Sequence, residues 1–341
     1  LFYYALLSRN LLKFELAKKL LIQAISNYPS KVDHYILLAE ITRLEKDFLK
    51  SEELLLTARK INSRNSNVFY NLALLYRELD FKKALNNINI AIRLIPNNHI
   101  YKLLQAEIFL SLDNIDKSRS ILNNLLIDAN IRDKKPIMLI LSSLERREKN
   151  FDLAEKILIE IISNNKTFSL AYLNLSDLYF DQKLSEKAKK IILEGIAVNP
   201  QMAEMYVNLG VISRNLGEID EAKKYLLKAL SINKNLFKCF MNLSTFYDFS
   251  DNPKELKYLL NMSLSGLNKD DVTRILFSRG NIFHSQKLFG KAAENYMQAN
   301  EFKSKKYPSN KKYYLNKNLE IKDRFYNNES FKKADNSNQE L

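Results

Sequence analysis

The chain is poor in the residues that make tight turns. Its 341 residues include only six glycines and six prolines, against usual shares of about 7% and about 5%. Sandwiches, barrels and doubly wound sheets need many turns of this kind. This composition therefore excludes them and predicts a chain that is almost entirely helical.

Cysteine, histidine and the common catalytic motifs are scarce as well. Cys239 is the only cysteine, which excludes an intrachain disulfide and a metal site built from several thiolates. His34, His99 and His284 are far apart and form no HExxH pattern, and there is no GxxxxGK[ST], GxGxxG or GxSxG sequence. We therefore expect no catalytic residue, cofactor, metal or small-molecule substrate on this chain.

The charge is basic but scattered. Lys and Arg number 53 against 39 Asp and Glu, a net charge of +14. No arginine cluster is interleaved with aromatic residues, so nucleic acid is not the partner that this pattern favours. No apolar run reaches about 18 residues, and the first ten residues lack the basic start and cleavage site of a signal peptide. We expect a cytoplasmic protein that does not enter a membrane.

The feature that decides the fold is an internal repeat of 34 residues. Segment 169–202 aligns with segment 203–236 without a gap. The residues that coincide are mainly apolar or small: Tyr172 with Tyr206, Leu175 with Leu209, Ser176 with Gly210, Ala188 with Ala222, and Ile192 with Leu226. A constant period of this length is typical of proteins built from stacked helical repeats.

These positions resemble the tetratricopeptide repeat, which has an aromatic residue at position 4, Leu at 7, a small residue at 8 and Ala at 20. The resemblance implies an all-α, right-handed solenoid (superhelix) of paired antiparallel helices. About nine units are expected: 1–31 (partial), 32–65, 66–98, 99–134, 135–168, 169–202, 203–236, 237–272 and 273–306. Units 99–134 and 237–272 fit least well, because Ser118 and Leu256 stand at position 20.

Both ends of the array carry expectations of their own. Residues 307–326 are expected to form a capping helix, and the polar residues 327–341 a disordered tail. Leu1 falls at position 4 of its unit. We therefore expect the first helix to lack its first turn and the chain to be a fragment.

The resemblance also implies a binding surface, because the first helix of each unit lines the concave groove of such a stack. Position 6 of that helix is asparagine in four units: Asn71, Asn174, Asn208 and Asn242. Carboxamides can pair with the backbone of an extended peptide, and the series resembles the asparagine ladder of tetratricopeptide arrays in protein-modifying glycosyltransferases. Further groove candidates are Tyr70, Arg77, Asp177, Arg214, Asp248, Asn281 and His284.

Three functional hypotheses remain open. The first is a scaffold that binds a protein or an extended peptide in this groove. The second rests on residues 290–310, GKAAENYMQANEFKSKKYPSN, which resemble the end of the repeat region in tetratricopeptide–sulfotransferase fusion proteins. That resemblance implies a parent enzyme that transfers a sulfuryl group, although its P-R-S-G-[ST]-T donor loop is absent here. The third is an RNA-binding helical repeat protein.

Overall fold

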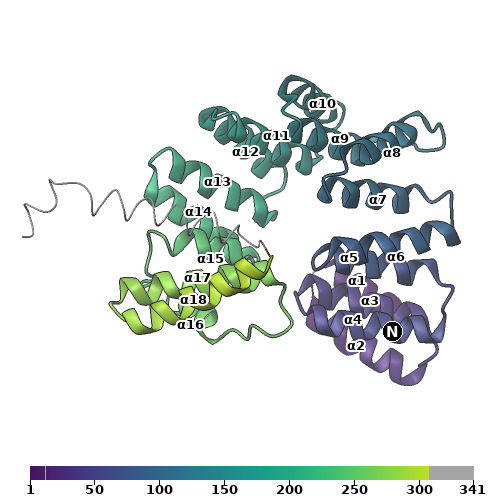
Figure 1. Cartoon of the computed structure of the whole chain (residues 1–341), viewed down its shortest axis with the longest axis horizontal. Coiled ribbons are helices and arrows are strands. Elements are labelled where there is room, and N and C mark those ends of the chain that lie inside the picture. The colour runs from purple at the N-terminus through teal and green to yellow at the C-terminus, as the bar shows by residue number, and fades with distance from the viewer. Residues whose placement is uncertain (12, 307–341) are drawn as a thin grey trace, which may run out of the picture.

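The computed structural model describes residues 1–11 and 13–306, and within them every regular element is an α-helix. Figure 1 shows these helices as a curved stack of antiparallel pairs. The helices are α1 (Phe2–Asn10), α2 (Phe14–Asn27), α3 (Val32–Leu44), α4 (Phe48–Ile61), α5 (Ser66–Arg77), α6 (Phe81–Leu94), α7 (His99–Ser111), α8 (Ile115–Ile127), α9 (Lys135–Arg147), α10 (Phe151–Asn164), α11 (Ser169–Asp181), α12 (Ser185–Val198), α13 (Ala203–Asn215), α14 (Ile219–Ile232), α15 (Phe237–Leu243), α16 (Pro253–Asn261), α17 (Lys269–Ser285) and α18 (Phe289–Lys306).

Two helices lie in each repeat expected from the sequence, with one shift in the boundaries. Helix α17 begins at Lys269, before the expected start of the ninth unit at residue 273. The expected capping helix at 307–326 and the expected tail at 327–341 lie outside the described residues. No helix within 1–11 and 13–306 is long and apolar enough to cross a membrane.

The odd-numbered helices form the inner layer of the stack. Each of them packs against the next odd-numbered helix, from α1 through to α17, and each except α15 also packs closely against its own partner in the pair. In a curved stack the inner layer is the one whose members lie closest together. The concave surface is therefore lined by the first helix of every pair.

Small residues at position 8 allow the two helices of a pair to approach closely. A Cβ atom added to Gly210 would lie 2.6 Å from Cγ of Leu226, and one added to Gly280 would lie 2.5 Å from Cε1 of Tyr296. Contacts this short do not occur between real side chains, so any larger residue would push the helices apart. The close contact between the paired helices therefore explains why position 8 holds a small residue.

Serine replaces the expected alanine at position 20 without loss of packing. Ser118 is fully buried, and its hydroxyl donates a hydrogen bond of 2.9 Å to the carbonyl of Ala106 at position 8 of the facing helix. Ser51 makes the same bond to Ala39 at 2.8 Å. Because the buried hydroxyl is satisfied, unit 99–134 keeps a regular helix pair, although its sequence fits the repeat pattern poorly.

The eighth pair is the irregular one. Helix α15 has seven residues and α16 has nine, which are shorter than the 13 or 14 residues of most other helices. Phe249, between them, has a φ of 63° and is fully buried against the rings of Phe240 and Tyr247, with centroids 5.9 Å and 4.9 Å away. The chain between the two short helices therefore contributes an aromatic side chain to the core of this pair.

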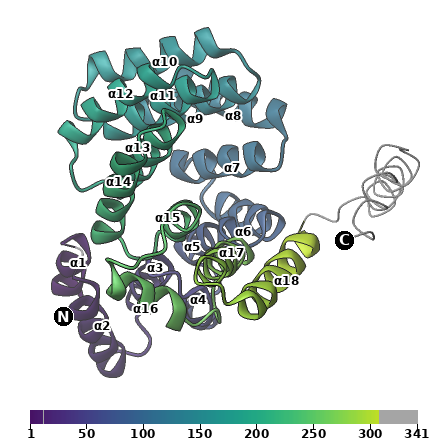
Figure 2. The ribbon, with the colours of Figure 1, turned by 90° about the vertical axis from the view of Figure 1, so that its left-hand side faces the viewer.

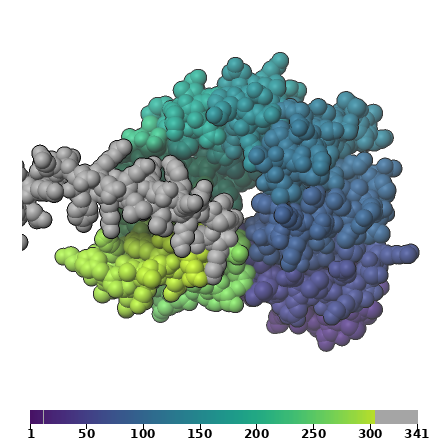
Figure 3. Space-filling view, viewed as in Figure 1, coloured from purple at the N-terminus to yellow at the C-terminus, as the bar shows by residue number. Residues whose placement is uncertain are grey.

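The two ends of the stack come into contact. Nζ of Lys46, in the α3–α4 turn, lies 3.8 Å from a carboxylate oxygen of Asp271 in α17, and Nδ2 of Asn235 donates to the carbonyl of Glu45 at 3.4 Å. Figure 2 shows the stack turned by 90°, and Figure 3 shows the surfaces of the two ends touching. The superhelix therefore closes into a ring whose inner wall is the concave surface.

Candidate functional site

The four asparagines at position 6 lie on odd-numbered helices and are half-buried. Asn71 is on α5, Asn174 on α11, Asn208 on α13 and Asn242 on α15. They therefore stand on the inner layer of the stack, at equivalent places in their repeats. Helix periodicity alone explains this, because one face of each odd-numbered helix packs on its partner and the opposite face remains available.

The carboxamides are held in two different ways. Nδ2 of Asn174 donates to Oγ of Ser143 at 3.3 Å, and Nδ2 of Asn208 donates to Oδ1 of Asp177 at 2.6 Å, so both link neighbouring repeats. Nδ2 of Asn71 and that of Asn242 instead donate, at 2.9 Å and 3.0 Å, to the backbone carbonyl four residues earlier in their own helix. In each case one N–H fixes the side chain, and no hydrogen bond to the carboxamide oxygen occurs among the described residues.

Asn281 is fixed more firmly than these four. Its Nδ2 donates to Oγ of Ser244 at 3.1 Å, and its Oδ1 accepts from the hydroxyl of Tyr296 at 2.9 Å. Both polar atoms of this carboxamide are therefore engaged in packing α17 against its neighbours.

Position 12 of the repeat, which lies on the odd-numbered helices, is arginine in five units. These five arginines were not predicted as a group from the sequence. They are Arg9, Arg43, Arg77, Arg146 and Arg214, and only Arg77 and Arg214 are among the groove residues expected from the sequence. The constant 34-residue spacing from Arg9 to Arg43 to Arg77 is the signal that could have revealed the series.

Three of these arginines pair with a carboxylate at position 9 of the next repeat. Arg9 lies 3.1 Å from Glu40, Arg77 lies 2.5 Å from Glu107, and Arg146 lies 3.5 Å from Asp177. Arg214 has no acidic partner in the described part of the chain, and its guanidinium lies 5.8 Å from the ring centroid of Phe246. The inner wall thus carries both neutralised and uncompensated positive charge.

Two cavities lie along this wall, and each contains one of the asparagines. The larger, with a volume of about 370 Å³, is bounded by α1, α3 and α5, and Tyr70 and Asn71 line it together with Leu74. The smaller, of about 80 Å³, is lined by Asn208, Asp177, Phe180, Val211, Ile212 and Lys238. The concave surface therefore offers recesses where the carboxamides meet apolar side chains.

Asp177 lines the smaller recess. Burial raises the pKa of its carboxyl group above the ordinary value, while the charges of Arg146 and Lys238 oppose that rise. Because it also accepts the hydrogen bond from Asn208, this carboxylate ties three consecutive repeats together at the inner wall.

The other expected groove residues lie apart from the asparagines. Asp248 is beyond the end of α15, in a turn where its Oδ1 accepts from the backbone N–H of Ser250 at 3.0 Å, a bond that lowers the pKa of Asp248. The ring of His284, near the end of α17, lies 5.5 Å from that of Phe289. The structure does not bring these two side chains together with the position-6 asparagines.

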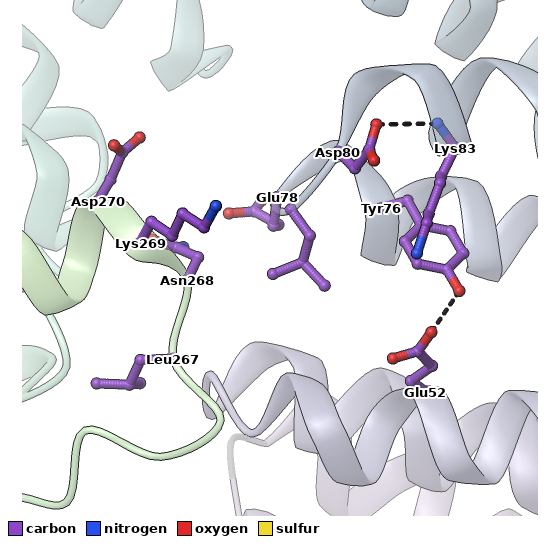
Figure 4. Close-up of a pocket in the computed structure, with 10 residues that line it drawn as sticks. Glu52, Tyr76, Glu78, Asp80, Lys83, Leu267, Asn268, Lys269 and Asp270 are labelled. Atoms are coloured by element: carbon purple, nitrogen blue, oxygen red, sulfur yellow. Dashed lines mark hydrogen bonds between the residues drawn. The ribbon is translucent and has the colours of Figure 1, made fainter. Parts of the chain in front are cut away.

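A third cavity, of about 420 Å³, lies where the two ends of the stack meet (Figure 4). Glu52, Tyr76 and Lys83 line one side, and the loop that precedes α17 lines the other. The hydroxyl of Tyr76 donates to Glu52, and burial raises the pKa of Tyr76. The described residues contain no group of three or more side chains able to hold a metal ion.

Comparison with known families identifies the repeat. The tetratricopeptide repeat model matches residues 170–202 and 203–236. The chain contains tetratricopeptide repeats. Both the repeat type and the all-α solenoid expected from the sequence are therefore confirmed.

Solved structures show the same architecture. A tetratricopeptide repeat protein from Parabacteroides merdae is 21% identical, with 68% of this chain and 91% of that chain covered and a TM-score of 0.55. The human IFIT1 dimer with PPP-AAAA is 15% identical, with 89% of this chain and 82% of that chain covered and a TM-score of 0.51. At these identities the likeness concerns the fold alone. No curated protein sequence matches the chain.

A solenoid of these repeats is in general a scaffold for protein interactions, because its curvature creates an extended concave surface. That coarse function is what the repeat and the fold establish for this chain. Which ligand the scaffold holds depends on the side chains of its inner wall.

Proposed function

We propose that the chain binds an extended peptide segment of a partner protein along its concave surface, without catalysing a reaction. The observation that carries the proposal is the placement of Asn71, Asn174, Asn208 and Asn242 at one repeat position on the inner layer. An extended peptide presents a donor and an acceptor at each residue, and a carboxamide can meet both. Repeated carboxamides can therefore hold a backbone without reading its side chains.

The hydrogen bonds of these side chains support this role. One N–H of each carboxamide is used to fix its orientation, which reduces the conformational entropy that binding would otherwise remove. The oxygen and the second N–H are left for a ligand. At a net gain of about 1 kcal/mol per hydrogen bond, several such contacts are needed for useful affinity, and a ladder supplies them.

The test is a comparison of peptide binding by matched variants. A peptide is first selected with the full chain from a phage-displayed library of random twelve-residue peptides. The triple variant Asn174→Ala, Asn208→Ala, Asn242→Ala should then bind that peptide about ten- to a hundredfold more weakly, with unchanged helical circular dichroism.

The control is Asn87→Ala. Asn87 lies on the even-numbered helix α6, and its Nδ2 donates to the carbonyl of Lys83 at 2.9 Å, the same kind of bond that Asn71 makes. Its removal should leave peptide affinity unchanged. Equal affinity of the triple variant and the unaltered chain would contradict the ladder.

The sulfotransferase alternative stays a prediction from the sequence. Helix α18 contains residues 290–306 of the motif that suggested it, and residues 307–310 lie outside the described part of the chain. Sequencing the gene beyond the codon for Leu341 tests it. A following strand with P-R-S-G-[ST]-T would support a substrate-presenting role for the repeats.

RNA is the other candidate ligand, since IFIT1 with PPP-AAAA has a similar fold. Affinity for RNA depends on cations that neutralise phosphates. Three of the five position-12 arginines already pair with carboxylates of the same wall, which weakens the attraction for a phosphate backbone. The inner wall therefore favours a peptide.

A further inference from the structure

Two of the five position-12 arginines, Arg43 and Arg214, lack the carboxylate that the other three have, and Arg43 also has no aromatic ring beneath its guanidinium of the kind that Arg214 has in Phe246 among the described residues. Arg43, at position 12 of α3, is half-buried, and its guanidinium makes no hydrogen bond or ion pair with any described residue. In the repeats where the arginine is paired, position 9 of the next unit is Glu40, Glu107 or Asp177. In the unit that follows Arg43, position 9 is occupied by Leu74, which carries no charge. The partner of this guanidinium is therefore missing from the repeat itself.

The acidic groups around Arg43 are already engaged with other cations. Its charged surroundings are Arg77, Glu78 and Glu40, together with the phenol of Tyr70. Glu40 pairs with Arg9, and Glu78 lies 3.4 Å from Nζ of Lys46. Burial, and then the like charge of Arg77, lower the pKa of Arg43. A partly desolvated charge without its own partner is unfavourable until an anion reaches it.

We propose that Arg43 binds a carboxylate of the peptide ligand and so gives the groove a preference for an acidic side chain at one point. This inference rests on the proposed function and deepens it. Arg43 is on α3, one of the helices that bound the 370 Å³ recess, and its charge acts on Tyr70, which lines that recess together with Asn71 and Leu74. A guanidinium donates to a carboxylate through two parallel N–H groups, and Asn71 is placed to hold the neighbouring backbone.

The local charge favours a single carboxylate over a chain of phosphates. Asp33 and Glu40 line the same recess, and they would repel a ligand that carries a negative charge at every unit. One acidic side chain flanked by neutral or apolar residues places its charge at Arg43 alone. Its apolar neighbours would meet Leu6, Ile36 and Leu74.

The experiment uses the full chain and the random twelve-residue phage library. Selection is run on the unaltered protein, on Arg43→Gln and on the control Arg93→Gln, whose arginine is exposed on the even-numbered helix α6. Peptides from the unaltered protein and from Arg93→Gln should share an Asp or Glu at one aligned position. That preference should disappear with Arg43→Gln.

A double-mutant cycle then measures the contact itself. The selected peptide should bind Arg43→Gln about ten- to a hundredfold more weakly than the unaltered protein, the range expected for a charge-assisted hydrogen bond. Replacing the peptide's acid with its amide should weaken binding to the unaltered protein by a similar factor. The same replacement should have little effect on binding to Arg43→Gln.

Each other outcome overturns the inference in a distinguishable way. Enriched peptides that lack a shared acid but depend on Asn174 and Asn208 would refute the Arg43 site and leave the peptide-binding function standing. Failure to enrich any peptide would refute both. Arg43-dependent binding of a 5′-triphosphorylated tetra-adenosine RNA, in competition with the peptide, would assign the site to nucleic acid instead.

The unliganded variant gives a check on folding. Because Arg43→Gln removes a charge that has no partner in the described structure, its melting temperature should equal or exceed that of the unaltered chain. A lower melting temperature would mean that Arg43 has a structural role, and would contradict the inference.

Discussion

At the scale of single residues, Glu145 shows how a charged pair replaces an aromatic ring in the core. It stands at position 11 of its unit, where Phe109 and Tyr179 stand in neighbouring units, and its side chain is 1% exposed. The carboxylate accepts hydrogen bonds from the guanidinium of Arg119 and, at 2.8 Å, from Nδ2 of Asn150. A buried charge is tolerated here because it is fully partnered.

This pair predicts a dependence of stability on pH. Burial alone would raise the pKa of Glu145, but the bonds from Arg119 and Asn150 outweigh it and lower the pKa below its usual value. The stabilisation is therefore present above the unfolded-state pKa of about 4.3 and is lost as the pH falls through the folded-state value. Glu145→Gln should lower the free energy of unfolding by about 1–3 kcal/mol at pH 7 and by much less at pH 3.

Urea titrations of both proteins at the two pH values measure this difference. Glu148→Gln serves as the control, because Glu148 shares Arg119 but its side chain is 38% exposed, so its loss should cost less than about 1 kcal/mol. A deficit of Glu145→Gln that is equally large at both pH values would contradict the assignment.

At the scale of elements, the turn between paired helices uses a left-handed residue that is rarely glycine. Position 15 has positive φ at Lys46, Asp113, Lys149, Lys183, Gly217 and Lys287. A residue other than glycine is disfavoured in this conformation by about 1 kcal/mol. The turn therefore keeps its left-handed conformation at position 15 even where the residue there is not glycine and disfavours it.

Exchanging residues at this turn should change stability in opposite directions. Lys183, with φ of 65°, is exposed, so Lys183→Gly should raise the free energy of unfolding by about 0.5–1 kcal/mol. Gly217→Ala should lower it by a similar amount, although nothing lies within 4 Å of the added Cβ. Urea midpoints of the two variants decide this, and a destabilised Lys183→Gly would show that the turn is not limited by backbone strain.

The helix pairs could be predicted from the sequence because their packing depends on residue size at fixed spacing. Gly210 and Ala222, at positions 8 and 20 of their unit, are small residues at the contact between two paired helices. The recurrence of small residues at these two positions can be recognised in the sequence alone. The shortening of α15 could not be predicted. It is accompanied by the burial of Phe249 against Phe240, a contact that the repeat pattern does not encode.

The candidate site was predictable only in part. The asparagines share one position, so their placement on the inner layer followed from the period. The hydrogen bonds of these side chains could not be predicted from the period, because those from Asn174 to Ser143 and from Asn208 to Asp177 join neighbouring repeats. The missing partner of Arg43 became visible only when the pairs formed by Arg9 and Arg77 were known.

At the scale of the whole molecule, closure of the ring rests on few contacts. Lys46 lies between Glu78 at 3.4 Å and Asp271 at 3.8 Å, and a Cβ atom added to Gly266 would lie 3.6–3.7 Å from side-chain atoms of Asp47 and Leu49. Partly exposed ion pairs contribute about 0–1 kcal/mol each and are screened by salt. The ring is therefore expected to open at this junction before any repeat unfolds.

Small-angle X-ray scattering tests this expectation. The radius of gyration should increase in 1 M NaCl, and Lys46→Gln should show the increase already at low salt. Lys50→Gln is the matched control, since within residues 1–11 and 13–306 the ion-pair partner of Lys50 is Glu53, one turn away in its own helix. A radius that is the same for all three proteins at both salt concentrations would mean that other contacts hold the ring closed.

The most direct test of the account is to find which layer of the stack touches a bound peptide. A photo-reactive benzoylphenylalanine is placed at Leu74 or Val211 on the inner wall, or at the exposed Leu153 or Leu193 on even-numbered helices. The account predicts cross-links to the selected peptide from the first two positions only. Cross-links from Leu153 or Leu193, with none from the inner wall, would contradict it.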